Sequence, residues 1–172
     1  MHPLEKFEYC PLCGSHHFVE NSATSKKCDN CGFEYFMNPS SSNVAIIRNS
    51  KGEILVERRK HEPAKGTLDL PGGFTEIGET SEEGVAREVK EETGLTITAA
   101  RYLFSIPNVY RYSGIDIHTL DMFYECDIED ETAIKAGDDA AECMWVKPKD
   151  IHTEQFGLRS VRWGLVKFLE KL

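Results

Sequence analysis

The 172-residue sequence predicts an α+β fold in which strands pack around two helices, in the manner of an α/β/α sandwich. Three observations predict this fold class. A strand–turn–strand pattern covers 44–58, a capped helix pattern follows Thr80, and apolar residues recur with helical spacing near the C-terminal end. Residues 96–106 and 118–128 are rich in β-branched and aromatic side chains, so we expect two further strands there.

Local signals place the first strands and a late one. Asn49–Gly52 is a turn-forming stretch between two apolar runs, so strands are expected at Val44–Arg48 and Ile54–Arg58. A short strand is also expected at 144–146, where Met, Trp and Val follow one another.

Two helices are predicted. Thr80 and Glu83 fit a capping box, and Gly94 suits the residue just past the end of a helix. The second helix lies near the C-terminal end, where the helical spacing involves Val161, Leu165, Phe168, Leu169 and Leu172.

The composition changes near residue 39. Residues 1–38 are rich in Cys, Gly and polar residues and contain no long apolar period, whereas the strand pattern begins shortly afterwards. Pro39–Ser42 is expected to be a short connection. We therefore predict a small domain at 1–38 and a larger domain at 39–172.

Four of the six cysteines form two C-x-x-C pairs, each followed by glycine. Each pair can aim two thiolates at one point, and two pairs complete a tetrahedral Zn²⁺ site. The alternatives are two disulfides or four free core cysteines. Four protein thiolates leave no open coordination position, so this zinc would be structural. The expected ligands are Cys10, Cys13, Cys28 and Cys31.

The charge balance restricts the class of function. The net charge is −9, with 29 acidic and 20 basic residues, which argues against a protein that mainly binds nucleic-acid phosphates. No apolar run approaches the roughly 20 residues that span a bilayer, and the first residues do not resemble a signal peptide. We expect a cytoplasmic protein that binds neither nucleic acid nor membrane.

The first predicted helix carries a strip of charge. At about 100° per residue, Arg87, Glu88, Glu91 and Glu92 fall side by side. Carboxylates at this spacing repel one another unless a cation lies between them, and hard divalent cations prefer oxygen ligands. Arg87 can partly neutralise and orient them. The alternative is a solvated acidic face of the helix.

The spacing of these residues matches a known motif. From Gly73 to Leu95 the sequence fits the Nudix box, G-x₅-E-x₇-R-E-U-x-E-E-x-G-U with U apolar, at all nine specified positions. From Val44 onward the chain therefore resembles the Nudix hydrolase superfamily. Residues 1–38 resemble the zinc ribbon that precedes the catalytic domain in NADH pyrophosphatase-type members.

This resemblance implies a mixed-sheet sandwich and an activity that depends on Mg²⁺ or Mn²⁺. The implied reaction is hydrolysis of a nucleoside diphosphate linked to another group, such as ADP-ribose or an NADH-like dinucleotide. Glu88, Glu91 and Glu92 match the family's metal-binding carboxylates, and the Gly72 carbonyl matches another ligand position. Arg87 matches the residue that orients the glutamates.

Three further positions have two interpretations each. Phe74 matches an aromatic residue that stacks on the nucleotide base, but it is also suited to a core role. Asp139 and Glu142 match late metal-binding acids of zinc-ribbon relatives, or they belong to a solvated turn. The general base stays open among Glu88, Glu91 and a later residue.

The resemblance also implies a homodimer, because ribbon-bearing relatives shape the substrate pocket with residues of both chains. The aromatic cluster at 33–37 would either pack on the chain's own sheet or form the contact between chains. The alternative function is a catalytically silent Nudix-like sensor that binds a nucleotide. The complete set of box acids counts against a sensor, which has no need of a metal cluster.

Overall fold

A computed structural model describes residues 2–137 and 140–172, and the chain divides into two compact units. The first unit is Met1–Pro39 with Arg111–Ile117, and the second is Ser40–Tyr110 with His118–Leu172. Each unit contains buried apolar residues of its own.

The smaller unit contains a three-stranded antiparallel sheet, β1 (Phe18–Glu20), β2 (Ser25–Cys28) and β3 (Glu34–Phe36), in that order. Its buried cluster is very small and contains Cys10, Phe18 and Cys28, with Phe33 packed against it. The burial of so few apolar side chains does not offset the loss of chain entropy on folding. A unit of this size therefore needs a metal ion or another cross-link to be stable.

Within the part of the chain that the structure describes, six further strands belong to the larger unit, apart from the β7–β8 tip at Arg111–Ile117. They are β4 (Ser40–Ile47), β5 (Ile54–Arg59), β6 (Leu68–Asp69), β7 (Ile97–Tyr112), β8 (Ile115–Ile128) and β9 (Ala140–Val146). One sheet has the order β4-β8-β7, in which β4 and β8 run parallel, and the other has the order β6-β5-β9, in which β5 is antiparallel to both neighbours. This unit therefore has the expected mixture of strand directions.

Two helices belong to the same unit, α1 (Ser81–Thr93) and α2 (Arg159–Leu169). The predicted caps of α1 are confirmed: the side chain of Thr80 accepts from the backbone of Glu83, whose side chain in turn accepts from the backbone of Thr80. Gly94 ends the helix in the left-handed conformation, with φ 73°. Three short 3₁₀ segments follow β8 and β9, namely η1 (Glu131–Ala133), η2 (Pro148–Asp150) and η3 (Thr153–Gln155).

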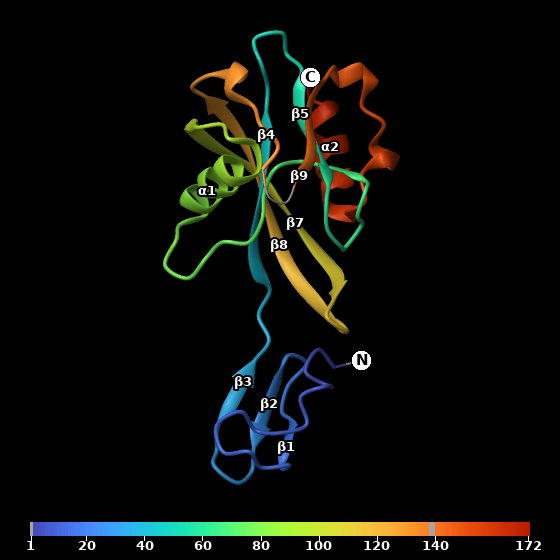
Figure 1. Ribbon diagram of the computed structural model, residues 1–172. Helices are drawn as coiled ribbons and strands as arrows, with labels where there is room; N and C mark the ends of the chain where they lie inside the picture. The colour runs from blue at the N-terminus through green and yellow to red at the C-terminus, as the bar shows by residue number, and fades with distance from the viewer. Residues whose placement is uncertain (1, 138–139) are drawn as a thin grey trace. The chain divides into compact units, whose positions relative to one another are not determined.

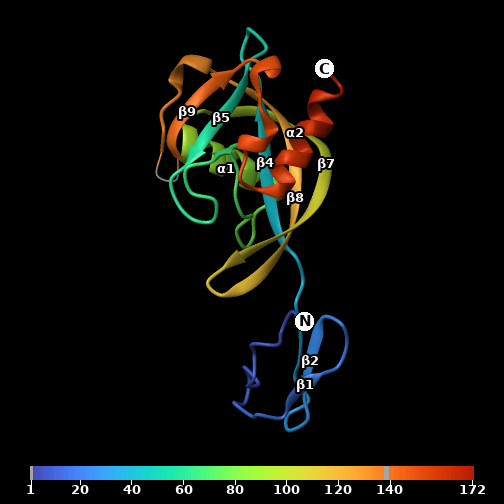
Figure 2. The same cartoon turned by 90° about the vertical axis from the view of Figure 1, so that its right-hand side faces the viewer.

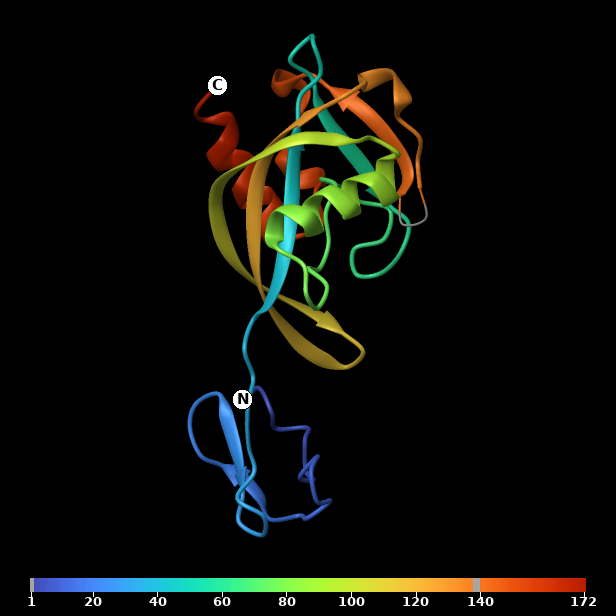
Figure 3. The same ribbon diagram turned by 90° about the vertical axis from the view of Figure 1, so that its left-hand side faces the viewer.

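Alternate side chains of the strands enter two separate cores. Val44 and Ile46 of β4 pack in one cluster with residues of α2, whereas Ala45 and Ile47 pack in the other with residues of α1. Successive side chains of a strand point to opposite faces, so this sorting places the strands between the two helices. Figure 2 shows α2 in front of the strands, and Figure 3 shows α1 in front of them from the opposite side. The predicted sandwich is confirmed (Figure 1).

The strand boundaries expected from the sequence are corrected in two places. Ser40–Ser42 forms the start of β4 rather than a connection, because its backbone pairs with Thr119–Asp121 of β8. The strands β7 and β8 extend beyond 106 and before 118, and only Ser113 and Gly114 lie between them. Both of these residues have positive φ, 49° and 81°, as a tight hairpin turn requires.

Candidate functional site

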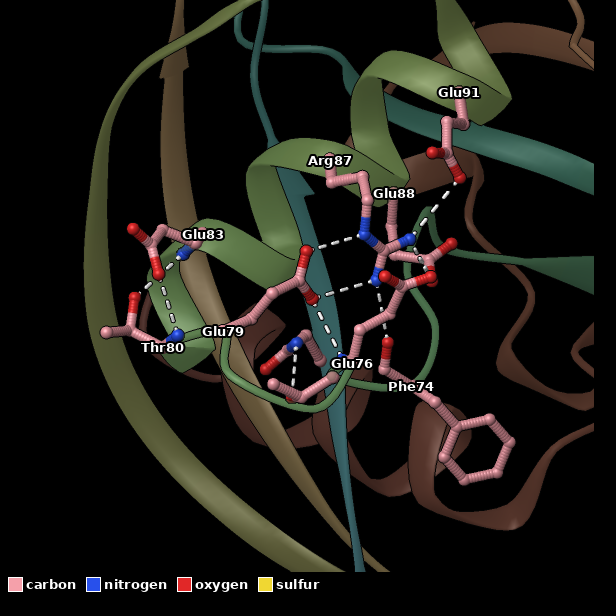
Figure 4. A network of polar contacts seen from close by, with 10 residues as sticks. Phe74, Glu76, Glu79, Thr80, Glu83, Arg87, Glu88 and Glu91 are labelled. Atoms are coloured by element: carbon pink, nitrogen blue, oxygen red, sulfur yellow. Dashed lines mark hydrogen bonds and ion pairs between the residues drawn. The ribbon is translucent and has the colours of Figure 1, made fainter.

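Arg87 of α1 is the centre of a polar network between the helix and the preceding loop (Figure 4). Its Nε donates to Glu79 Oε1 at 2.7 Å and its Nη2 to Glu79 Oε2 at 3.1 Å. Nη1 donates to Glu88 Oε1 at 2.9 Å and to Glu91 Oε2 at 3.3 Å. Nη2 also donates to the Phe74 carbonyl at 2.9 Å. One guanidinium thus joins two helix glutamates to two points of the loop.

The charges in this network shift one another's proton affinities. The Arg87 hydrogen bonds lower the pKa of Glu79, and the backbone N–H of Glu76 adds to the effect at 2.8 Å. In return, the Glu79 carboxylate and then Glu88 raise the pKa of Arg87. Both groups are therefore charged at neutral pH, and the link between loop and helix is charge-assisted.

The loop before α1 lies along β4. The backbone N–H of Asn43 donates to the Gly73 carbonyl at 2.8 Å, and the N–H of Thr75 donates to the Ser41 carbonyl at 3.1 Å. The loop therefore continues the sheet for a few residues before it turns into the helix, which fixes its backbone relative to β4.

Two glycines in this loop have no room for a side chain. Gly72 has φ 152°, and a Cβ there would lie 2.0 Å from the carbonyl oxygen of Asn43. A Cβ on Gly73 would lie 2.5 Å from the carboxyl carbon of Glu88. The Glu88 carboxylate thus lies directly against the loop backbone, in the space that any larger residue at Gly73 would occupy.

Glu92 is 6% exposed and is held by the same loop, because Glu92 Oε2 accepts a hydrogen bond from the backbone N–H of Gly72 at 2.8 Å. Burial raises the pKa of Glu92 well above its usual value, and the nearby carboxylates of Glu57, Glu88 and Asp69 raise it further. The loop and α1 therefore enclose a strongly acidic region that extends to β5 and β6.

Sequence reasoning missed Glu57 and Asp69, which are buried carboxylates at paired positions of β5 and β6. Glu57 lies two residues after Leu55, so the alternation of β5 turns it toward α1. Asp69 forms an ion pair with Arg59 and accepts from the N–H of Leu70 at 2.9 Å, and burial raises its pKa. Glu57 could have been identified from the sequence, because the alternation of the strand places this carboxylate at a position that faces the core.

The three box glutamates share a helix but differ in environment. Glu92 is buried, Glu88 is largely covered by the loop, and the Glu91 side chain is 59% exposed. Within the described ranges, only the four N-terminal cysteines place three or more possible ligand atoms within 4.8 Å of one another. The structure thus brings the glutamates to one side of α1 without gathering their oxygens at one point.

The remaining predicted positions are distributed around this region. Phe74 is 42% exposed and its ring points away from Arg87, so this side chain is not buried in the core (Figure 4). Glu142 of β9 forms an ion pair at 3.5 Å with Arg58, its register partner on β5. The next residue, Cys143, has its Sγ 3.8 Å from the Glu92 carbonyl. Because successive side chains of a strand point to opposite faces, Glu142 points away from the face that Cys143 shares with Glu92. Asp139 lies outside the described residues.

The smaller unit brings the two C-x-x-C pairs together. The Sγ atoms of Cys10, Cys13, Cys28 and Cys31 all lie within 4.8 Å of one another. Two of the Sγ–Sγ distances, Cys10–Cys31 and Cys13–Cys28, are 3.7 Å. Zinc–sulfur bonds of about 2.3 Å in a tetrahedron imply sulfur separations of about 3.8 Å, whereas a disulfide bond is far shorter. The cluster therefore has the dimensions of a zinc site, and its cysteines are free.

Backbone geometry explains how each pair forms. Gly14 and Gly32 have φ of 72° and 76°, and their N–H groups donate to the carbonyls of Cys10 and Cys28 at 2.8 Å. The backbone N–H of Ser15 and the side chain of Asn30 lower the pKa of the Cys13 thiol to about 6. The thiolate is the form that binds metal.

The NUDIX domain family matches residues 38–168, which is most of the chain and includes the whole loop–helix described above. The chain belongs to the Nudix family. It is 31% identical over 106 residues to the NAD-capped RNA hydrolase NudC of Vibrio atlanticus (strain LGP32), a match that covers 62% of this chain and 39% of that protein. The chain thus spans about two fifths of the length of that relative.

Two other similarities cover larger shares of both chains. An ADP-ribose pyrophosphatase of Methanocaldococcus jannaschii is 39% identical over 121 residues, covering 68% of this chain and 67% of that protein. The crystal structure of a NUDIX hydrolase from Nitrosomonas europaea has a TM-score of 0.76 at 23% identity and covers 95% of this chain and 91% of that one. The second similarity supports the fold. Among the described residues, no helix is long and apolar enough to cross a membrane.

Proposed function

We propose that the chain is a metal-dependent hydrolase that cleaves the diphosphate linkage of a nucleoside diphosphate derivative. The observation that carries this proposal is the complete Nudix box in folded form. Arg87 joins Glu79 of the loop to Glu88 and Glu91 of α1, and the Gly72 N–H holds Glu92 beneath the same loop.

The donor set suits Mg²⁺ or Mn²⁺. Glu88, Glu91, Glu92 and the Gly72 carbonyl supply only oxygen atoms, which hard cations prefer. The like charges that surround Glu92 make a cation there favourable, since it would offset their repulsion. When bound, the ion supplies positive charge to the phosphoryl oxygens and lowers the pKa of the attacking water.

The chain's own residues orient the reaction and move its proton. Arg87 holds Glu88 and Glu91 in place and offsets part of their charge. A carboxylate of this pair accepts a proton as a water oxygen bonds to phosphorus and the bridging phosphorus–oxygen bond breaks. The bridging oxygen leaves with the second phosphate, so the products are two phosphate monoesters.

The substrate that we propose contains an ADP-ribose unit or a related dinucleotide. The named relatives support this class, since one is an ADP-ribose pyrophosphatase and another acts on NAD-capped RNA. Both names describe compounds in which a nucleoside diphosphate carries a second ribose. The exposure of Phe74, whose carbonyl accepts from Arg87, supports the proposal that its ring stacks on a base.

The zinc-ribbon part of the proposal is a structural Zn²⁺ held by the four N-terminal cysteines. Their mutual distances support it, because they match those of sulfur atoms around a tetrahedral zinc ion. We assign no catalytic step to this site.

The test is a substrate panel with purified, zinc-loaded protein and added Mg²⁺ or Mn²⁺. ADP-ribose, NADH, NAD⁺, a dinucleoside diphosphate and a short NAD-capped RNA would be compared by chromatography of the products. Reaction in H₂¹⁸O identifies the phosphorus that water attacks. We expect two phosphate monoesters from the ADP-ribose-containing compounds. Tight nucleotide binding without turnover of any compound would instead support the silent sensor.

A further inference from the structure

Asn43 is a buried polar residue in the middle of β4, 1% exposed, between the box loop and the start of α1. A buried amide destabilises the fold unless its donor and acceptor are both satisfied. The partners that satisfy Asn43 belong to the loop and to the helix, so the contacts of this side chain connect three segments.

The contacts of Asn43 hold both ends of the segment between Gly73 and α1. Its backbone N–H donates to the Gly73 carbonyl at 2.8 Å, and its Nδ2 donates to Thr75 Oγ1 at 3.0 Å. At the other end, the hydroxyl of Ser81, the first residue of α1, donates to Asn43 Oδ1 at 2.5 Å. Movement of the loop relative to α1 would break at least one of these bonds.

Close packing makes the arrangement stiff. A Cβ on Gly84 would lie 2.6 Å from Asn43 Nδ2, so the first turn of α1 lies directly against the amide. A Cβ on Gly72 would lie 2.0 Å from the Asn43 carbonyl oxygen, so the loop backbone lies against the strand as well. Loop, strand and helix therefore meet at Asn43 without space for adjustment.

We propose that Asn43 is a positioning residue that sets the distance between the Gly72 carbonyl and the carboxylates of α1, and thereby the affinity of the site for divalent cations. This inference rests on the proposed metal-dependent function. The side-chain hydrogen bonds of Asn43 go to Thr75 and Ser81, and neither of these residues is an expected metal ligand. Its effect would be exerted through Gly73, whose backbone lies against Glu88, and through the helix that carries all three glutamates.

The experiment measures Mn²⁺ binding by electron paramagnetic resonance in zinc-loaded protein without substrate, together with the Mg²⁺ concentration that gives half-maximal activity. Asn43→Leu removes both side-chain hydrogen bonds and keeps the same number and branching of side-chain heavy atoms. We expect its Mn²⁺ dissociation constant to rise about 10- to 100-fold, the usual effect of removing a group that orients metal ligands. The half-saturating Mg²⁺ concentration should rise in parallel, with kcat partly restored at high Mg²⁺.

Two matched comparisons separate positioning from stability. Thr75→Val removes the hydroxyl that bonds both Asn43 Nδ2 and Ser41 Oγ, whereas Thr75→Ser keeps both bonds, so the valine variant should weaken Mn²⁺ binding and the serine variant should not. Ser41→Ala removes only the bond to Ser41 and should leave Mn²⁺ binding unchanged. Val161→Ala shortens a buried side chain of α2 on the other face of the strands, and it should lower the unfolding temperature without changing Mn²⁺ affinity. If Asn43→Leu does not fold, the two Thr75 variants decide the question.

The outcomes distinguish this inference from the function on which it rests. Wild-type affinity in both Asn43→Leu and Thr75→Val, with wild-type protein that binds Mn²⁺ and turns over substrate, would overturn the role of Asn43 alone. Wild-type protein that neither binds Mn²⁺ nor hydrolyses any compound of the panel would overturn both proposals.

Discussion

The Arg87 guanidinium donates two hydrogen bonds to the Glu79 carboxylate, one of 2.7 Å from Nε and one of 3.1 Å from Nη2. The two residues are eight positions apart and belong to different segments, the loop and α1. The same guanidinium reaches Glu88, so the first acid of the box acts on a proposed metal ligand through Arg87.

This pair predicts a pH-dependent contribution to stability. The Arg87 hydrogen bonds place the folded-state pKa of Glu79 below its unfolded value. The ionised carboxylate therefore stabilises the fold above the unfolded pKa of about 4.3, and this contribution is lost as the pH falls through the lower, folded pKa. In urea unfolding at pH 7, the free energy of unfolding should be larger for wild type than for Glu79→Gln. This difference should become smaller below about pH 4. Glu82→Gln, at an exposed position of α1, is the control. A difference between wild type and Glu79→Gln that stays constant at all pH values would contradict the prediction.

The ends of α1 could be predicted from sequence because the signals are local. Thr80 and Glu83 satisfy each other's backbone groups within four residues, and Gly94 supplies the conformation that ends the helix. The side-by-side placement of the box residues also follows from helical periodicity alone. Their roles as ligands and as base stay predictions, because those depend on the ion and the substrate.

Other features could not be predicted because they depend on distant partners. Ser40–Ser42 has the composition of a loop, and it becomes a strand only through backbone pairing with β8, almost eighty residues later. Glu57 and Asp69 lie in short apolar runs, and their approach to Glu92 depends on the packing of β5 and β6 against α1. The same limitation applies to Asn43, whose partners lie 32 and 38 residues away.

The environment of Glu92 predicts that Glu92→Gln lowers the activity but does not lower the stability of the metal-free protein. Burial and neighbouring carboxylates raise its pKa, so its charged form destabilises the fold at neutral pH. Glu92→Gln keeps the shape and can still accept from the Gly72 N–H, so the metal-free variant should unfold at the same temperature or higher. Its kcat should fall by more than the roughly 10- to 100-fold that is typical of residues that only orient ligands.

The rise in unfolding temperature on addition of Mg²⁺ gives a second measurement of the same substitution. A ligand that binds only the folded state stabilises it, so wild-type protein should show this rise and Glu92→Gln should largely lose it. Glu82→Gln should behave as wild type. Near wild-type turnover of Glu92→Gln at saturating Mg²⁺ would exclude Glu92 as a ligand.

The cysteines predict a stepwise pattern of thiol reactivity. Burial raises the pKa of both Cys126 and Cys143 to about 12, so neither thiol should react readily with a disulfide reagent at pH 8 in folded protein. The other four should be protected by one zinc per chain until a chelator removes it. Titration with the disulfide reagent should therefore detect few thiols in the folded, zinc-loaded protein. It should detect four thiols after chelation of the zinc and six after unfolding. Elemental analysis without zinc, together with mapped disulfides among the four, would contradict the metal site.

Two aromatic side chains of β3, Tyr35 and Phe36, are 41% and 51% exposed in the single chain, whereas Phe33 packs in the ribbon's own core. The expected homodimer would use such apolar surface, and we predict that Tyr35 and Phe36 contribute to it. Light scattering should then give the mass of two chains for wild-type protein and of one chain for the double variant Tyr35→Glu/Phe36→Glu. Val19→Glu, at an exposed apolar position on the opposite edge of the same small sheet, is the matched control.

Ionic strength separates an apolar dimer from one held by charge. Each chain carries a net charge of −9, so association brings like charges together, and salt that screens them should strengthen an apolar contact. A dimer that dissociates as salt increases would instead depend on ion pairs, and Tyr35 and Phe36 would lose their assigned role. A monomeric mass for fully active wild-type protein at micromolar concentration would remove the dimer and place every residue of the active site in one chain.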